Sequence, residues 1–246
     1  MKILVINPNT SESMTAAIEE AARKYARPDT VVEAINPRRG PRSIEGYVED
    51  FTSAVATLEE IAERRGQYDA FIIACYGDPG LAAAKELVSE PVIGIAEASM
   101  HMASLVAHKF SILTVIRRIK PMLEDMVKLS GLSERCASIR TTELAVLDIE
   151  KDYARAEQIL IEEGRKAIEE DGAEAICLGC AGMGPLDKRI QAALGVPVLD
   201  GVACAVKMAE ACIDYGITTS KVQAYKHPEP KEYVNWPVFN KLAAKV

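Results

Sequence analysis

Two stretches of this chain, residues 70–80 (AFIIACYGDPG) and residues 175–185 (AICLGCAGMGP), share one plan. Each begins with an apolar run typical of a buried strand, places a cysteine where that run ends, and continues into a turn that contains glycine and proline. Glycine permits close approach of the backbone, and proline is favoured where a helix begins. The two stretches therefore predict two strand–turn–helix units with Cys75 and Cys180 at equivalent positions.

The similarity extends to both sides of the two cysteines, which indicates an internal repeat. An apolar run that ends at Asn7 lies 68 residues before Cys75, and one that ends at Thr114 lies 66 residues before Cys180. A Pro-Val pair that begins another strand-like run follows the first cysteine by 16 residues and the second by 17. The matching intervals predict two related lobes.

Strand-like and helix-like patterns alternate along most of the chain. Val- and Ile-rich runs separated by helix-length segments indicate parallel sheets with helical crossovers. We expect an α/β protein with two pseudo-symmetric parallel-sheet lobes of the Rossmann or flavodoxin type, formed by residues 1–97 plus 206–246 and by residues 98–205. Ligands of such sheets bind at the carboxyl ends of the strands, which places the active site in the cleft between the lobes. The expected strands are residues 3–6, 31–35, 70–74, 92–95, 111–115, 175–178 and 196–199, and the expected helices include residues 11–25, 48–64, 81–88 and 153–170.

The charge and apolar content limit the possible partners of the protein. The 246-residue chain has a net charge of -7, whereas a protein that neutralises phosphates needs a basic surface, so nucleic acid is not the expected partner. No apolar run approaches membrane-spanning length, and the apolar run at residues 3–6 is too short for a signal peptide. We therefore expect a cytoplasmic protein that acts without nucleic acid or membrane, as a closed homo-oligomer.

Six cysteines in a reducing compartment are expected to be free thiols. Cys177 and Cys180 form a Cys-x-x-Cys pair, which invites a redox or a zinc interpretation. Redox versions usually open a helix, whereas Cys177 lies within an apolar run, and the three histidines form no ligand-spaced cluster. We therefore expect no metal and no cofactor, and we expect Cys136, Cys204 and Cys212 to be structural.

The settings of Cys75 and Cys180 are those expected of reactive thiols. Each cysteine is expected to face the positive end of a following helix, which lowers the pKa of a thiol and offers N–H groups to an anion. Two opposed thiols suit inversion at a carbon with an acidic hydrogen, because a thiolate can remove the proton from one face while a thiol returns one to the other. The enolate oxygen formed between the two steps needs N–H donors, and the Gly-rich turns are natural sources of them.

Five motifs support a resemblance to a known family. They are residues 6–10 (INPNT), 43–46 (SIEG), 74–81 (ACYGDPGL), 178–183 (LGCAGM) and 197–201 (PVLDG). In order and spacing they resemble the hydantoin and allantoin racemase branch of the aspartate/glutamate/hydantoin racemase superfamily, from about residue 2 to about residue 222. The resemblance implies two pseudo-symmetric α/β lobes and a cofactor-free mechanism with Cys75 and Cys180 as catalytic residues. The residues expected to bind the substrate are Asn7, Ser43, Ile44, Tyr76, Gly77, Asp78, Thr114, Ala181 and Gly182.

The residues that follow the two cysteines favour a particular substrate class. Amino-acid racemases of the superfamily resemble Cys-Asn-Thr and Cys-Thr-His, whereas this chain reads CYG at 75–77 and CAG at 180–182. Because these turns lack polar side chains for a free ammonium and carboxylate, we expect a neutral cyclic ureide, namely a 5-substituted hydantoin, with allantoin as a close variant. The branch usually has Thr-Thr where this chain has Thr114-Val115, so no hydrogen bond is carried over to Val115.

Three alternative functions remain open from the sequence. An amino-acid racemase of the Asp/Glu type is disfavoured by the residues of the two turns. A decarboxylase of the arylmalonate type resembles one-cysteine protonation, and the presence of both cysteines counts against it. A two-lobed ligand-binding protein of the periplasmic type is disfavoured by the paired thiols and by the missing signal peptide.

Overall fold

The computed structural model describes residues 1–240 and contains two four-stranded parallel sheets in this part of the chain. The first sheet has the order β2–β1–β3–β4, and the second has the equivalent order β6–β5–β7–β8. The strands are β1 (Lys2–Ile6), β2 (Val31–Ile35), β3 (Ala70–Ile73), β4 (Val92–Gly94), β5 (Phe110–Thr114), β6 (Cys136–Thr141), β7 (Ala175–Leu178) and β8 (Val198–Asp200). The expected α/β fold with two pseudo-symmetric parallel-sheet lobes is confirmed.

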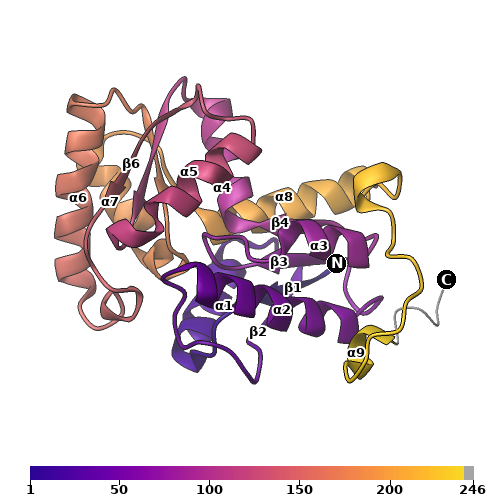
Figure 1. Cartoon of the computed structure of the whole chain (residues 1–246). Helices are drawn as coiled ribbons and strands as arrows, with labels where there is room; N and C mark the ends of the chain where they lie inside the picture. The colour runs from indigo at the N-terminus through magenta and orange to yellow at the C-terminus, as the bar shows by residue number, and fades with distance from the viewer. Residues whose placement is uncertain (241–246) are drawn as a thin grey trace.

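Helices follow the strands and cover the sheets. The first group is α1 (Glu12–Tyr25), α2 (Tyr47–Glu63), α3 (Leu81–Leu87) and α4 (Ile95–Val106). The second group is α5 (Lys120–Leu129), α6 (Tyr153–Glu169), α7 (Asp187–Leu194) and α8 (Gly201–Tyr215), and α9 (Pro237–Asn240) ends the described chain. Short 3-10 helices are η1 (Arg117–Ile119), η2 (Val146–Asp148), η3 (Ala181–Leu186) and η4 (Gln223–Tyr225). Figure 1 shows α5, α6, α7 and β6 on one side of the molecule and α1, α2, α3 and β1 to β4 on the other.

Alternation along the central strand of the first sheet separates two apolar cores. In β1, Ile3 and Val5 belong to the main core, which also includes residues of the second lobe, whereas Leu4 and Ile6 belong to a smaller core. Successive side chains of a strand point to opposite faces of the sheet, so the buried residues of one strand, Ile3 to Ile6, serve both cores. The smaller core lies against α2 and α3, and Ile61 of α2 is fully buried in it. Both faces of the first sheet are therefore covered.

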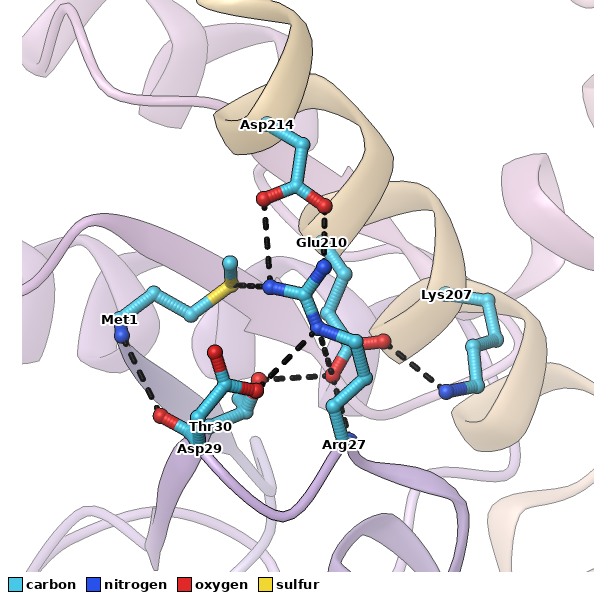
Figure 2. A network of polar contacts seen from close by, with 7 residues as sticks. All are labelled: Met1, Arg27, Asp29, Thr30, Lys207, Glu210 and Asp214. Carbon is cyan, nitrogen blue, oxygen red and sulfur yellow. Dashed lines mark hydrogen bonds and ion pairs between the residues drawn. The ribbon is translucent and has the colours of Figure 1, made fainter.

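Helix α8 comes after the second sheet but packs against α1 and against strands β3 and β4 of the first sheet. A polar network supports this packing (Figure 2). The buried carboxylate of Glu210 in α8 accepts hydrogen bonds from the Arg27 backbone N–H at 2.7 Å, the Thr30 hydroxyl at 2.8 Å and the Lys207 ammonium at 2.9 Å. The Arg27 guanidinium also pairs with Asp214 one turn further along α8. The loop before β2 and the second half of α8 are thus held together.

The lobe boundaries expected at residues 97/98 and 205/206 fall within α4 and α8, and they remain a prediction. Residues 241–246 of the expected 206–246 segment lie outside the described residues. The yellow C-terminal segment ends beside α2, where α9 packs (Figure 1). Among the described helices, none combines the length and the apolar character needed to cross a membrane.

Candidate active site

A pocket lies between the two lobes, where residues that follow strands of both sheets come together. It contains about 540 Å³ of empty space, part of which is open to solvent. Cys75 and Gly77, which follow β3, line it from the first lobe, and Gly179 and Cys180, which follow β7, line it from the second. The pocket is therefore at the carboxyl ends of the central strands, where open α/β sheets bind ligands.

The two cysteines have equivalent backbone surroundings in this pocket. The N–H of Gly77 donates to the Cys75 sulfur, and the N–H of Gly182 donates to the Cys180 sulfur. The backbone carbonyls of the two cysteines also have equivalent partners. The Cys75 carbonyl accepts a hydrogen bond from the Asp78 N–H at 2.9 Å, and the Cys180 carbonyl accepts one from the Met183 N–H at 3.1 Å. Cys75 is half-buried, and Cys180 is 8% exposed. Each sulfur thus receives an N–H from the residue two positions later.

The acidity of the two thiols differs from the expectation based on helix ends. Burial raises the pKa of the Cys75 thiol far above its ordinary value, although the Gly77 N–H acts in the opposite direction. Burial likewise raises the pKa of Cys180 to about 11, against the effect of the Gly182 N–H. The expectation of lowered thiol pKa values is therefore wrong for the ligand-free protein, because removing a thiolate from water costs more than one backbone donor returns.

Carboxylates lie near both sulfurs and add to this effect. Asp50 and Asp78 raise the pKa of Cys75 through their charge, and Glu150 and Glu45 do so for Cys180. Asp50 Oδ1 and Glu150 Oε1 are buried without a hydrogen-bond partner among the described residues. The surroundings of the thiols are therefore acidic, and they disfavour a bound anion.

Most of the remaining lining of the pocket is apolar. It consists mainly of aliphatic side chains and methionines from the loops and helices around the cleft: Met14, Ile44, Val115, Ile119, Met122, Leu123 and Val146. Five of these seven residues, from Val115 to Val146, come from the second lobe. The pocket thus combines a sulfur-lined end with an apolar wall that can bury a hydrophobic group.

The structure brings six of the sequence-predicted site residues into the lining of this pocket. They are Ile44, Cys75, Tyr76, Gly77, Cys180 and Ala181. Tyr76 lines the pocket, and its hydroxyl is within 2.8 Å of the Ser99 hydroxyl of α4. Tyr76 therefore joins the turn after Cys75 to a helix at the centre of the molecule.

Five other predicted residues, namely Asn7, Ser43, Asp78, Thr114 and Gly182, are not among the residues that line the pocket. The Asn7 amide donates to Asn9 Oδ1 at 2.9 Å and to Thr15 Oγ1 at 3.0 Å. The Thr114 hydroxyl donates to the Gly179 carbonyl at 3.1 Å, just before Cys180. These polar side chains hold the loops next to the pocket, and their contact with substrate remains a prediction.

Sequence reasoning missed Asn9 and the apolar wall as parts of the pocket. Asn9 lies in the same INPNT motif as the predicted Asn7, so the motif contains the signal, but it is Asn9 that lines the pocket. Ile119, Met122 and Leu123 lie in a segment for which no helix was predicted, and nothing in an apolar helical face tells a core position from a pocket wall. Only the packing of the lobes could show that these side chains meet the cysteines.

Cys177 does not take part in the pocket with Cys180. Its side chain is fully buried, and its thiol donates to the Ser99 carbonyl at 3.6 Å. Within residues 1–240 no group of three or more His, Cys, Asp or Glu side chains is arranged to hold a metal ion. The Cys-x-x-Cys pair is thus divided between a buried strand and the site.

Comparison with known proteins identifies the family. The sequence model of the Asp/Glu/hydantoin racemase family matches residues 3–209. The chain belongs to this family. A hydantoin racemase of Pseudomonas sp. (strain NS671) is 52% identical over 236 residues, which cover 95% of this chain and 94% of that protein. Allantoin racemase from Klebsiella pneumoniae has 44% identity and a TM-score of 0.94, with 98% of each chain covered.

More distant solved structures share the fold. Glutamate racemase from Francisella tularensis is 15% identical and superposes with a TM-score of 0.62 over 99% of this chain and 94% of that chain. The two-lobed architecture is therefore common to relatives with different names. Together with the closer relatives, the family membership makes this protein a racemase, that is, an isomerase.

Proposed function

We propose that this racemase inverts C5 of 5-substituted hydantoins by two-base proton transfer between Cys75 and Cys180, without a cofactor. One observation carries the proposal: the two thiols follow equivalent strands of the two sheets and line a single pocket. Racemisation needs a proton taken from one face of a carbon and returned to the other, and two similar groups serve both directions. The related hydantoin and allantoin racemases support this assignment.

In the proposed reaction, the thiolate of one cysteine takes the C5 proton and becomes a thiol. The electron pair of the broken C–H bond moves onto the adjacent carbonyl oxygen, which gives an enolate. The thiol of the other cysteine then gives its proton to the opposite face of C5 and becomes the thiolate. The backbone N–H groups of Tyr76 and Ala181, for which the described structure provides no acceptor, are our candidates for donors to the enolate oxygen.

The deprotonated thiol is costly in the ligand-free site, since burial raises the pKa of both cysteines. A thiolate of high proton affinity is, however, a stronger base toward a weakly acidic C–H bond. At a fixed pH this gain in basicity is smaller than the loss of thiolate, so the proposal requires that the pKa of one thiol falls when the substrate is bound.

The pocket favours an apolar 5-substituent. Its wall of Ile44, Val115, Ile119, Met122 and Leu123 is apolar, so a polar group such as the ureido arm of allantoin would find the Asn9 amide but few other hydrogen-bonding side chains. Fully burying a side chain the size of Leu or Phe is worth about 1.5–3 kcal/mol, which such a wall can provide. We therefore prefer an alkyl or arylalkyl hydantoin to allantoin as the substrate. The carboxylates near the sulfurs disfavour aspartate, glutamate and arylmalonates.

Polarimetry on a panel of substrates tests this proposal. Protein dialysed against a chelator should racemise L-5-benzylhydantoin and L-5-isobutylhydantoin at least tenfold faster, in kcat/KM, than allantoin, and should leave L-aspartate and L-glutamate unchanged. Rapid loss of rotation from glutamate or aspartate, with the hydantoins inert, would overturn the substrate class. Activity that returned only with an added divalent metal or pyridoxal phosphate would refute the cofactor-free mechanism. A cytoplasmic location and a homo-oligomeric state stay predictions.

A further inference from the structure

Asp50 is a half-buried charged group beside the pocket for which the proposed reaction has no role. It lies in the first turn of α2, and its Oδ1 atom has no hydrogen-bond partner in the described part of the chain. Burial raises the pKa of this carboxyl to about 6, and no neighbouring cation or donor acts against that. Because an unpaired buried polar atom lowers the stability of the folded protein, its presence requires an explanation.

The unpaired oxygen faces the turn that carries Cys75. A methyl group placed on Gly77 would lie 2.7 Å from Asp50 Oδ1 and 3.9 Å from Cys75 Sγ, so the carboxylate and the sulfur are both close to this position. A side chain at position 77 would require the carboxylate to move. The other charged or titratable groups that face Cys75 are Cys180 and Asp78, and Asp50 affects the sulfur more than either.

We propose that Asp50 is a positioning residue that keeps Cys75 protonated, so that Cys75 is held as a proton donor in the resting pair. A negative charge near a sulfur disfavours the thiolate, and Asp50 is ionised at pH 7 and above. The inference rests on the proposed function, since it assigns a resting state to the two-thiol pair.

The inference predicts the reactivity of Cys75 in Asp50→Asn, a variant of nearly unchanged shape. Iodoacetamide alkylation of the full-length protein, followed at each cysteine by peptide mass spectrometry between pH 8 and 9.5, measures the thiolate fraction directly. Loss of the charge should lower the pKa of Cys75 by about one unit, which gives about tenfold more thiolate. A thiolate of lower pKa is less nucleophilic, so the expected net gain in alkylation rate at fixed pH is about threefold. The rate at Cys180 should stay within a factor of about 1.5.

Glu49→Gln is the matched control. Glu49 is the preceding residue of α2 and also has a buried, unpaired oxygen, but that oxygen faces Gly46, 2.9 Å from a methyl group placed there, and not the Cys75 turn. The control should leave the Cys75 rate unchanged. Asp50→Ser gives the same measurement if the Asn variant does not fold.

Two results would overturn the role of Asp50. One is an unchanged Cys75 rate in a folded Asp50 variant, and the other is an equal gain in Glu49→Gln. The readout does not depend on turnover, so it is separate from the proposed function. A threefold gain in the Cys75 alkylation rate of Asp50→Asn would support the effect of Asp50 on Cys75. If Cys75→Ser nevertheless kept full racemase activity, the two-thiol reaction would be rejected while that effect remained.

Discussion

Gly77 and Gly182 occupy equivalent positions, two residues after the cysteines, and both donate an N–H to a sulfur. Their surroundings differ, however. A methyl group on Gly77 would lie 2.7 Å from Asp50 Oδ1, whereas one on Gly182 would meet only Cys180 Sγ at 3.8 Å and Met14 Cε at 3.9 Å. The pseudo-symmetry of the backbone is thus not matched by the side chains around it.

This difference predicts that alanine substitutions at the two equivalent glycines lower the free energy of unfolding by unequal amounts. Gly77→Ala should lower the free energy of unfolding by about 1–3 kcal/mol, because the carboxylate must move to make room. Gly182→Ala, which adds a methyl group at ordinary contact distance, should change the free energy of unfolding by less than about 1 kcal/mol. Urea unfolding of the two variants and the parent protein measures both values. Equal costs would mean that the carboxylate does not occupy the space beside Gly77.

At the residue level, the sequence predicts the two cysteines and their turns, because strand ends and Gly-rich turns leave a local pattern. It does not predict the raised pKa of Cys75, since this follows from burial and from Asp50, which lies 25 positions earlier in the chain. The sequence predicts only that Val115 lacks the hydrogen bond of the usual threonine, whereas in the structure Val115 is part of the apolar wall. Local patterns thus identify reacting groups, whereas their environment depends on contacts that are distant in sequence.

At the level of elements, a carboxylate caps the helix that follows the last strand of each sheet, but it comes from a different position in each lobe. In the first lobe, Asp78 of the cysteine turn accepts two backbone N–H groups at the start of α4, at 3.1 and 2.9 Å, and faces Gly94 at the end of β4. In the second lobe, Asp200 at the end of β8 accepts two N–H groups at the start of α8, at 3.2 and 3.0 Å, and faces Gly184 of the turn. A carboxylate in the same place caps the next helix in both lobes. Because the carboxylate and the glycine change places, the repeat in the sequence hides this correspondence.

Strand β6 shows where sequence patterns are insufficient for an element. Its residues, CASIRT, are mostly half-buried at the edge of the second sheet, and only Ile139 is buried. The central strands β1, β3, β5 and β7 were predicted because continuous burial selects apolar runs. The edge strands β2, β4 and β8 are also predicted from their apolar residues, whereas β6 has few of them, so its strand character depends on pairing with β5, which a single sequence does not show.

The network in Figure 2 predicts a large effect for one buried carboxylate. Glu210 is 3% exposed; burial alone would raise its pKa, but its three donors outweigh burial and hold the pKa below the ordinary value. Glu210→Ala should lower the free energy of unfolding by about 2–4 kcal/mol, because Arg27 N–H, Thr30 and Lys207 lose their acceptor. Asp214→Ala, which removes a half-exposed ion-pair partner, should cost less than about 1 kcal/mol.

The pH dependence of the loss in unfolding free energy caused by Glu210→Ala gives a second check. A carboxylate with a lowered pKa stabilises the fold above the pKa of the unfolded chain and loses this contribution as the pH falls through its folded pKa. The gap in unfolding free energy between the parent protein and Glu210→Ala should therefore shrink as the pH is lowered from about 5 to about 3. A gap that widened on acidification would contradict the assigned role of the Glu210 charge.

At the level of the whole molecule, duplication of one sheet order places two equivalent thiols in one site. Each lobe contributes a central strand, a cysteine and a turn, and the main apolar core extends through both lobes. The spacing of the repeat predicts this arrangement, because equal intervals between strands and cysteines give equal positions in the two sheets. How the lobes pack does not follow from the spacing, and that packing makes the apolar wall on which the substrate preference rests.

The central claim is that each thiol acts on one face of C5, and hydrogen exchange in deuterated water tests it most directly. Cys75→Ser and Cys180→Ser should each reduce racemisation of 5-benzylhydantoin by several orders of magnitude, because a hydroxyl is a far weaker acid than a thiol. The intact thiol of each variant should still exchange a proton on its own face. Proton NMR combined with chiral chromatography should then show deuterium entering one enantiomer without inversion, and opposite enantiomers in the two variants. Near-normal racemisation in either variant, or exchange into the same enantiomer in both, would contradict the two-thiol account.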